Sequence, residues 1–502
     1  MDRRPGSTIA TIGAGVVIAV VAFLPRATAL DHGMTVDEPL WVARSARFTD
    51  AILHGHFSRA FETGHPGVPT MWIGGLAQRT LPHGASLIER LARARLGLAI
   101  ADVLLILAIW LMVRPLLGRR AAVFGALTLA LDPFLIAHNR VLQLDGILAL
   151  SMLAAFVALM NATRRTARTG AWLALSGAFA GIALLERAFF AGFLILAAIV
   201  VLQRSLVGLR GLKPWLLTAA VVFIGAWPAL WVNPVHPLKL ILTGSASSAA
   251  DVTSSGFFLG RHVSPPGIVV YPVVAALRST AFTLIAGLGA TVWALRHRAS
   301  DDQARLAGAF LCFGALFALA IGLGLKTADR YLLPALVAVD VAAAIGLVAA
   351  ARRIGKALPA AAVTALALAA HAGPGLATHP LELSAYNWLA GGPFAARHAI
   401  VVGWGEGLEE AAKDLAKFPD AATATVATTR INGFAQFFPG RTIAMNDSEL
   451  AKPGGVHSDY ALFYISSLQI GRQDAIYSHF KNRKPVYTLK LDAITYVTVY
   501  RV

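Results

Sequence analysis

The sequence has few charged residues and almost no cysteine. Charged residues make up 14% of the 502 positions and hydrophobic residues 57%, whereas soluble proteins carry roughly a quarter charged residues. So little polar material cannot cover a soluble surface of this size, which excludes a cytosolic enzyme and a disordered chain. The single cysteine, Cys312, lies in an apolar run and allows neither an internal disulfide nor a cysteine-based metal site. The composition indicates a membrane protein.

Long apolar runs recur along the first three quarters of the chain. A helix needs roughly 20 apolar residues to cross a bilayer core of ~30 Å. By this measure we expect eleven spans, near residues 8–25, 95–113, 121–137, 141–161, 171–186, 188–203, 214–232, 271–295, 306–325, 330–350 and 357–374. The fifth and sixth are short, and we interpret the Glu186-Arg187 pair between them as the tip of a hairpin at a membrane surface.

The positive charge follows the topology. Lys and Arg number 44 against 27 Asp and Glu, and the excess lies in every second short loop. With a cytoplasmic N-terminus these basic loops all face the cytoplasm, as the positive-inside rule expects. They are residues 1–4, 114–120, 164–168, 204–213, 296–305 and 352–356. The charge therefore reflects orientation and contact with lipid headgroups, and no nucleic-acid partner is needed. We expect a multi-pass protein of a bacterial plasma membrane.

The chain divides into a membrane region, residues 1–375, and a polar tail, residues 376–502. Two large polar loops of the membrane region, 26–94 and 233–270, fall on the same non-cytoplasmic side as the tail. In the tail, helical spacing over Glu406–Lys417 predicts a helix. Short runs rich in β-branched and aromatic residues predict strands at His398–Trp404, Thr423–Thr428, Tyr460–Ile465, Pro485–Leu491 and Ile494–Val502. We therefore expect a polytopic α-helical membrane protein with a small extracytoplasmic α/β domain.

Ionisable residues near membrane depth cost roughly 2.5–3.5 kcal/mol each and need a reason. On the predicted topology they occur in five separate connections and would line one cavity, with carboxylates for base chemistry beside cations that bind an anionic group. They are Asp37-Glu38, His65, Arg140 with Asp145, Glu186-Arg187, and Lys326 with Asp329-Arg330-Tyr331. Each also has an ordinary explanation. Asp37 before a proline is typical of a helix cap, His65 of a loop, and Arg140 and Arg187 of helix ends at a membrane interface.

The order of these motifs resembles a known family. An acidic pair after the first span is followed by His-Pro, by Arg-x-x-x-x-Asp at the third-to-fourth turn, and by Lys-x-x-x-Arg-Tyr-x-x-Pro entering a late span. This order resembles the GT-C class of polyprenyl-phosphate-sugar-dependent glycosyltransferases, in the superfamily of protein O-mannosyltransferases and aminoarabinose transferases. Residues 402–408, with the sequence VGWGEGL, look like the start of the C-terminal domain in bacterial members. The glycines of this stretch fit a tight strand-to-helix turn better than a phosphate loop, because the full G-x-G-x-x-G pattern is missing.

The resemblance implies roles for individual residues. Asp37 corresponds to the general base, and Glu38 would orient the loop or the acceptor. Lys326 and Arg330 correspond to the cations that hold the lipid phosphate, and His65 lies near the sugar-phosphate. The remaining candidates for the donor site are Arg140, Asp145, Arg187 and Tyr331. Relatives often carry lysine where this chain has Glu186-Arg187.

The expected reaction transfers a sugar with inversion from a polyprenyl phosphate to an acceptor hydroxyl on a glycan, glycolipid or protein. The leaving phosphate is already anionic, and cations stabilise its growing charge while a carboxylate removes the acceptor proton. We expect no cofactor and no metal, because lysine and arginine can neutralise the phosphate. Two alternatives stay open: a transporter or lipid flippase, and a non-catalytic assembly factor. Against a transporter, the charges gather on one side and no inverted repeat is visible.

Overall fold

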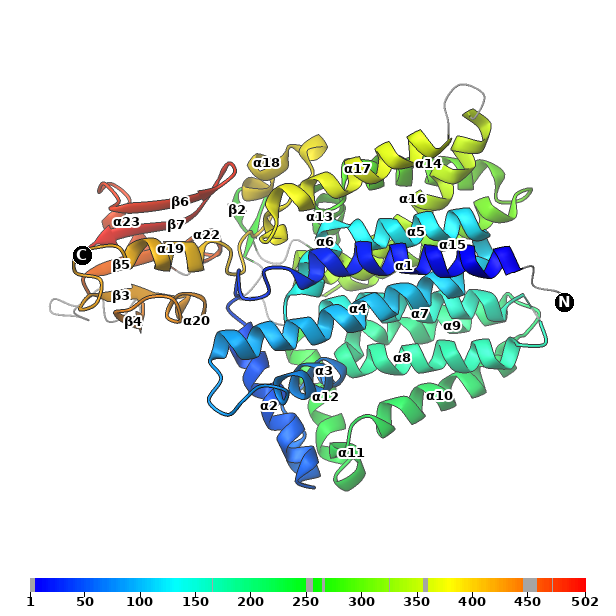
Figure 1. Ribbon diagram of the computed structural model, residues 1–502, viewed down its shortest axis with the longest axis horizontal. Helices are drawn as coiled ribbons and strands as arrows, with labels where there is room; N and C mark the ends of the chain where they lie inside the picture. Colours follow the sequence, from blue (N-terminus) through cyan, green and yellow to red (C-terminus); the bar gives the residue numbers. More distant parts are fainter. Residues whose placement is uncertain are drawn as a thin grey trace.

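In the computed structural model, the chain forms a helical bundle with a small α/β domain at one end (Figure 1). The structure describes residues 5–164, 166–249, 256–263, 267–324, 326–354, 360–445, 458–471 and 473–502. Parts of three predicted cytoplasmic loops, residues 1–4, 165 and 355–356, lie outside the described residues. We call the end of the bundle that carries the α/β domain the domain end.

Seven helices in the described chain are long and apolar enough to cross a membrane. They are α1 (Pro5–Ala27), α4 (Leu87–Leu117), α7 (Asp145–Ala162), α8 (Thr169–Ala191), α15 (Asp302–Gly322), α16 (Leu333–Ile354) and α17 (Ala360–Thr378). At 1.5 Å per residue, the 31 residues of α4 exceed a bilayer core, and its capped N-terminus projects at the domain end. The side chains of α7 are almost all buried, so this helix forms the centre of the bundle.

Two further candidate spans are broken by capped turns. Helices α5 (Arg119–Leu131) and α6 (Pro133–Arg140) meet at a bend of 57°, where the Asp132 side chain accepts a hydrogen bond from the Leu135 amide at 2.6 Å. Helices α13 (Val270–Arg278) and α14 (Ala281–His297) meet at 120°. The polytopic helical fold is confirmed, but the count of eleven is not, since the described chain offers seven spans, or nine with the bent pairs.

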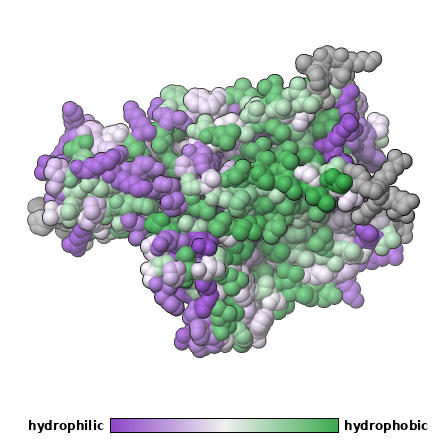
Figure 2. Space-filling view, in the orientation of Figure 1, coloured by the Kyte–Doolittle hydropathy of each residue, from purple (hydrophilic) through white to green (hydrophobic). Residues whose placement is uncertain are grey.

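The predicted hairpin tip at Glu186-Arg187 coincides with a break in the helical backbone at Arg187. Helix α8 continues to Ala191 with a kink at Arg187, and α9 (Phe193–Gln203) starts after Gly192. Helix α9 has 11 residues and the following α10 (Leu212–Gly225) has 14, so both are shorter than a full crossing. A broad apolar band covers the outside of the bundle between polar ends, as Figure 2 shows.

Short helices cover the domain end of the bundle. All but α11 come from the two predicted polar loops, whereas α11 forms the end of the predicted span 214–232; α2 and α11 lie below the bundle in Figure 1. Their bounds are α2 (Glu38–Leu53), η1 (Phe57–Arg59), α3 (Val68–Gln78), α11 (Ala229–Val232) and α12 (Val235–Ala249), followed by β1 (Phe257–Phe258), β2 (Arg261–His262) and η3 (Gly267–Val269). Another 3₁₀ turn, η4 (Asp329–Leu332), leads into α16.

The α/β domain contains a five-stranded mixed sheet in the order β4-β3-β5-β7-β6. Strand β3 is parallel to β4 and β5, whereas β7 is antiparallel to β5 and β6. The strands are β3 (Thr425–Thr428), β4 (Arg441–Ala444), β5 (Tyr460–Tyr464), β6 (Tyr487–Leu491) and β7 (Ile494–Arg501); the helices are α18 (Gly392–Ala399), α19 (Leu408–Leu415), α20 (Ile431–Phe434), α22 (Ile465–Gln469) and α23 (Asp474–Phe480). The remaining turns are η5 (Glu382–Ser384) and η6 (Trp388–Ala390).

Four of the five predicted strands and the predicted helix α19 are present, but the strand over His398–Trp404 is wrong. This segment is the end of α18 followed by an extended loop. Its backbone bonds the Gln469 side chain instead of a neighbouring strand: Val402 N–H donates to Gln469 Oε1 at 2.8 Å, and Gln469 Nε2 donates to the Ile400 carbonyl at 3.0 Å.

Candidate active site

Two adjoining cavities lie at the domain end of the bundle. The first encloses about 240 Å³ between the helices and the α/β domain. The second encloses about 290 Å³ between α2, the kink of α8 and the connection before α16. Four residues line both cavities, namely Asp37, Lys326, Arg330 and Tyr331. The structure therefore brings the predicted acid and two predicted cations to one shared wall.

Asp37 directs its carboxylate into the cavities and does not cap a helix. It occupies the N-cap position of α2, yet its side chain accepts no hydrogen bond from the backbone of this fully described helix. Its Oδ2 atom accepts a hydrogen bond from Nε1 of Trp404 at 3.0 Å. A half-buried carboxylate has lone pairs on both oxygens, and these can take a proton from a hydroxyl.

Asp145 holds two of the predicted cations in place. Its Oδ1 atom lies 3.5 Å from Nη1 of Arg187, and its Oδ2 atom 3.6 Å from Nε of Arg330. Asp145 itself is 2% exposed and is absent from the described lining of both cavities. It therefore acts as a shared counter-ion that fixes the spacing of two guanidinium groups, rather than as a wall of the donor site.

Arg187 reaches the second cavity because α8 is distorted at that residue. Its backbone angles, φ −151° and ψ 91°, are not helical. On the preceding residue, the buried Glu186 carboxylate accepts hydrogen bonds from the Thr70 amide and hydroxyl, both at 3.0 Å. The pair thus separates, with Glu186 anchoring α3 while the Arg187 guanidinium lies 5.0 Å from the ring centre of Tyr331.

Glu38, predicted beside Asp37 to orient the loop or the acceptor, is absent from the described lining of both cavities. It is completely buried and pairs with Arg95, with Oε1 at 2.7 Å from Nε and Oε2 at 2.5 Å from Nη2. The same carboxylate accepts the amides of Thr35 at 2.8 Å and Leu142 at 2.7 Å. Glu38 is a positioning residue that fixes the loop on which Asp37 lies.

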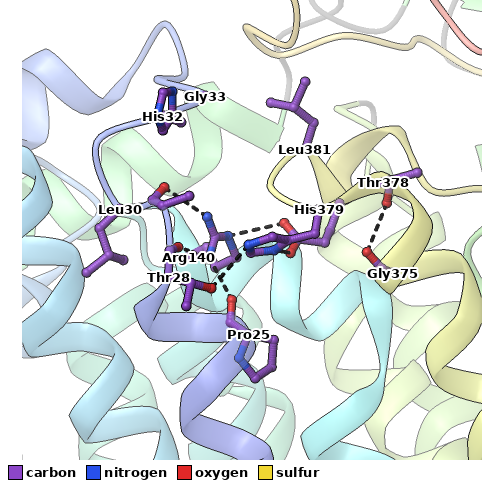
Figure 3. A network of polar contacts seen from close by, with 12 residues as sticks. Pro25, Thr28, Leu30, His32, Gly33, Arg140, Gly375, Thr378, His379 and Leu381 are labelled. Carbon is purple, nitrogen blue, oxygen red and sulfur yellow. Dashed lines mark hydrogen bonds and ion pairs between the residues drawn. The ribbon is translucent and has the colours of Figure 1, made fainter.

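Arg140 is also absent from the described lining of both cavities. Its guanidinium donates to the carbonyls of Pro25 and Thr28, each at 2.6 Å, and its Nε atom lies 3.2 Å from Glu382 Oε2. His379, beside it in Figure 3, bonds the Thr28 hydroxyl at 3.1 Å. The position matched by the family motif therefore joins the end of α1 to the segment after α17.

His65 lines the second cavity together with Arg44 and Arg187. Desolvation by the cavity walls, followed by the charges of Arg187 and Arg44, lowers the pKa of His65 to about 4. Its side chain is exposed, and the nearby charges of Arg187 and Arg44 add to the effect of desolvation. A neutral imidazole at pH 7 can accept or donate a hydrogen bond, but it adds no charge to the site.

Trp404 and Arg44 are cavity residues that the sequence analysis missed as site residues. The Trp404 ring covers the Arg330 guanidinium at 4.3 Å and bonds Asp37. Its loop docks on the segment before α2 through the bond from Val36 N–H to the Trp404 carbonyl at 3.1 Å. At Gly405, with φ +146°, a Cβ atom would lie 2.7 Å from the Met34 carbonyl oxygen. The absence of a side chain at Gly405 thus lets the Trp404 loop dock closely on the segment before α2. The glycines of residues 403–407 were the sequence signal that could have identified Trp404 as a site residue.

The two cavities differ in charge. Four cations line the second cavity, with Asp37 the only acid in its described lining; the cations are Arg44, Arg187, Lys326 and Arg330. Its apolar walls include Leu40 and Phe189, which are 45% and 53% exposed on the surface of the protein. This combination suits an anionic head with an apolar tail. The first cavity carries the Arg278–Asp329 ion pair at 2.6 Å as well as Glu406 and Arg430, and is close to neutral.

Comparison with known proteins shows which family model part of the chain matches and which solved structures share its fold. Residues 86–231 match the family model described as dolichyl-phosphate-mannose-protein mannosyltransferase. The chain is similar to ArnT of Cupriavidus metallidurans bound to undecaprenyl phosphate, with 14% identity, a TM-score of 0.54, and coverage of 99% of this chain and 98% of that chain. The apo state of that protein gives 15% identity, a TM-score of 0.51 and coverage of 98% of both chains. No curated protein matches the sequence significantly. The resemblance predicted from the sequence is confirmed for the fold.

Proposed function

We propose that this chain is an inverting glycosyltransferase that moves a sugar from a polyprenyl-phosphate donor to an acceptor hydroxyl at the outer face of the membrane. One observation carries the proposal: Asp37, Lys326 and Arg330 form the wall shared by the two cavities. A base and the cations for a leaving phosphate are the two parts that the reaction needs. The GT-C fold and the matched family segment support a transferase over a transporter.

The donor fits the second cavity. Lys326, Arg330 and Arg187 would hold the phosphate, and the polyprenyl chain would leave past Leu40 and Phe189 into the lipid. As the bond from the sugar to the phosphate oxygen breaks, these cations stabilise the charge that grows on the phosphate. They also neutralise it without help, so the proposed reaction needs no metal. His65 and Tyr331 would contact the donor beside the phosphate.

The acceptor enters from the first cavity, between the membrane helices and the α/β domain. The Asp37 carboxylate removes the proton of the acceptor hydroxyl, and the oxygen attacks the anomeric carbon from the side opposite the phosphate, which inverts the configuration. Trp404 orients the carboxylate through its indole N–H. The acceptor is a glycan, glycolipid or protein, the location a plasma membrane, and the N-terminus cytoplasmic.

A donor-consumption assay tests the proposal. The purified full chain in liposomes receives a radiolabelled polyprenyl-phosphate sugar and a mixture of membrane acceptors, and transfer is measured. We expect Asp37→Asn to abolish transfer while donor binding persists. Asp50→Asn is the matched control, since it introduces the same amide on α2 at a side chain that is 62% exposed.

Donor binding separates the enzyme from its rivals. Lys326→Ala and Arg330→Ala should weaken the binding of the labelled donor, whereas Arg79→Ala, at a side chain 50% exposed, should leave it unchanged. A transporter would instead move the intact lipid between leaflets without breaking the sugar–phosphate bond, and an assembly factor would do neither. Full transfer by Asp37→Asn would remove Asp37 from the role of base.

A further inference from the structure

Three buried side chains inside the helix bundle form a second polar cluster, away from both cavities. Asp132 lies at the break between α5 and α6, Asp340 on α16 and His371 on α17. One ligand atom from each lies within 4.8 Å of the other two. Their exposed fractions are 3%, 1% and 0%. Asp340 and His371 each lie seven residues, or ~10 Å, inside the domain end of their helix.

His371 is held in the tautomer that keeps a lone pair on Nδ1, the nitrogen that would bind a metal. Its Nε2 atom lies 2.9 Å from the carbonyl oxygen of Thr128, which only accepts hydrogen bonds, so Nε2 carries the proton. The lone pair of Nδ1 faces the Thr280 hydroxyl at 2.7 Å. That hydroxyl has a second acceptor in Thr283 Oγ1 at 3.2 Å. A histidine that donates its other ring nitrogen to a backbone carbonyl is typical of metal ligands.

The two carboxylates are oriented in the same way. Asp340 Oδ1 accepts the Thr283 hydroxyl at 2.7 Å, whereas Asp340 Oδ2 is fully enclosed and receives no hydrogen bond from the described chain. Asp132 Oδ1 accepts the Leu135 amide at 2.6 Å. Each of the three residues thus has a contact that orients it, and each contributes one ligand atom to the cluster. Asp340 is the residue whose enclosed oxygen lacks a donor.

The nearby cation, Arg26, directs its hydrogen bonds to other groups. Arg26 is completely buried and donates to neutral oxygens, namely the carbonyls of Ala22 and Ala130 at 2.9 and 2.8 Å and Asn139 Oδ1 at 2.9 Å. No ion pair joins Arg26 to Asp132 or Asp340 in the described part of the chain. Two adjacent carboxylates in an apolar interior are costly unless a cation or protons compensate them.

We propose that Asp132, Asp340 and His371 bind a divalent transition-metal ion such as Zn²⁺ or Mn²⁺. Two carboxylates and one imidazole suit these ions, and two positive charges balance the two carboxylates. The ion would join three parts of the bundle: the α5–α6 break, α16 and α17. Because α16 begins directly after Arg330 and Tyr331, this site would brace the cavity wall from within. It takes no part in the transfer step and is independent of the proposed function.

Metal analysis of the purified full chain tests the site. The protein is prepared in detergent with an affinity tag that contains no histidine, and its metals are measured by inductively coupled plasma mass spectrometry. We expect close to one equivalent of zinc or manganese, and its loss in Asp340→Asn and His371→Gln. Asp102→Asn is the matched control, a 1% exposed carboxylate outside the cluster, and should retain the metal. Metal retained by both cluster variants would overturn the assignment.

If the variants fail to fold, a metal titration of the wild-type chain tests the proposed site. Protein produced in metal-depleted medium is titrated with Zn²⁺ or Mn²⁺, and its thermal unfolding is followed. A bound ion stabilises the folded state, so Tm should rise and saturate at one equivalent, with no change on adding Mg²⁺. Absence of stoichiometric metal together with an unchanged Tm would show that protons compensate the carboxylates, and the proposal would be wrong.

Discussion

Asp37 and Glu38 are adjacent carboxylates that should respond in opposite ways to the same substitution. Glu38→Gln removes one partner of a completely buried pair, in which Arg95 is 2% exposed and bonded at 2.5 and 2.7 Å. In the variant, an amide N–H₂ group would also face backbone N–H groups whose hydrogen bonds the wild-type carboxylate accepts. Breaking one side of a buried ion pair costs about 3–5 kcal/mol. We therefore expect a large loss of stability from Glu38→Gln.

Asp37→Asn should leave stability almost unchanged but remove activity. Its amide oxygen can still accept the Trp404 indole N–H, and Asp145 remains as a counter-ion of Arg330. An amide cannot take a proton, and general-base catalysis contributes roughly 10²–10⁴-fold to rates. Thermal unfolding in detergent and sugar transfer, measured on the same preparations, separate the two residues.

A double variant gives the control. Glu38→Gln with Arg95→Gln replaces both charges, so it should lose less stability than the sum of the two single changes. The reasoning would be refuted if Glu38→Gln kept its Tm yet lost transfer to the same degree as Asp37→Asn. That result would place Glu38 in the chemistry and not in the scaffold.

Three further predictions concern the cavity walls. Trp404→Phe keeps a ring over Arg330 but loses the N–H bond to Asp37, worth about 1.5–3 kcal/mol, so transfer should fall roughly tenfold or more with little change in donor affinity; equal activity would exclude the positioning role. Lys326→Ala should raise the donor Kd roughly tenfold or more, measured by binding of labelled donor, and an unchanged Kd would contradict phosphate binding. The folded-state pKa of His65 is lowered from 6.5 to about 4, so between these pH values the unfolded chain binds more protons than the folded chain. The stability of the wild-type protein therefore falls as the pH is lowered from 6.5 toward 4. The Tm of His65→Gln should depend less on pH in this range, and a pH dependence identical to that of the wild type would show that His65 has an ordinary pKa.

The membrane fold could be predicted because the length of an apolar run and the charge of a loop are both properties of consecutive residues. Hydropathy locates α1, α4, α7, α8, α15, α16 and α17, and β-branched runs locate four of the five main strands. The segment 271–295, predicted as one span, bends by 120° between α13 and α14, and the sequence carries a signal for this bend. Thr280 caps α14 by accepting the Thr283 amide at 3.1 Å, and a Ser-Thr pair inside an apolar run is typical of such a cap.

The site could be predicted only in part, since side-chain direction depends on tertiary packing. The motifs correctly gave residues that face the cavities, such as Lys326 and Arg330. They could not show that Glu38 turns inward to Arg95, because both directions are open to a residue in the first turn of a helix. Nor could they link Trp404 to Asp37, which lies 367 positions away. Such contacts are fixed by how distant segments dock.

The docking of the Trp404 loop has a consequence for biogenesis. Ribosomes deliver the chain from its N-terminus, so every membrane helix can be inserted before the indole that orients Asp37 has been synthesised. A nascent chain that stops after α17 would present the cations without their aromatic cover and with the carboxylate unrestrained. The last quarter of the polypeptide thus determines when the pocket becomes complete, and competence is delayed until translation has finished.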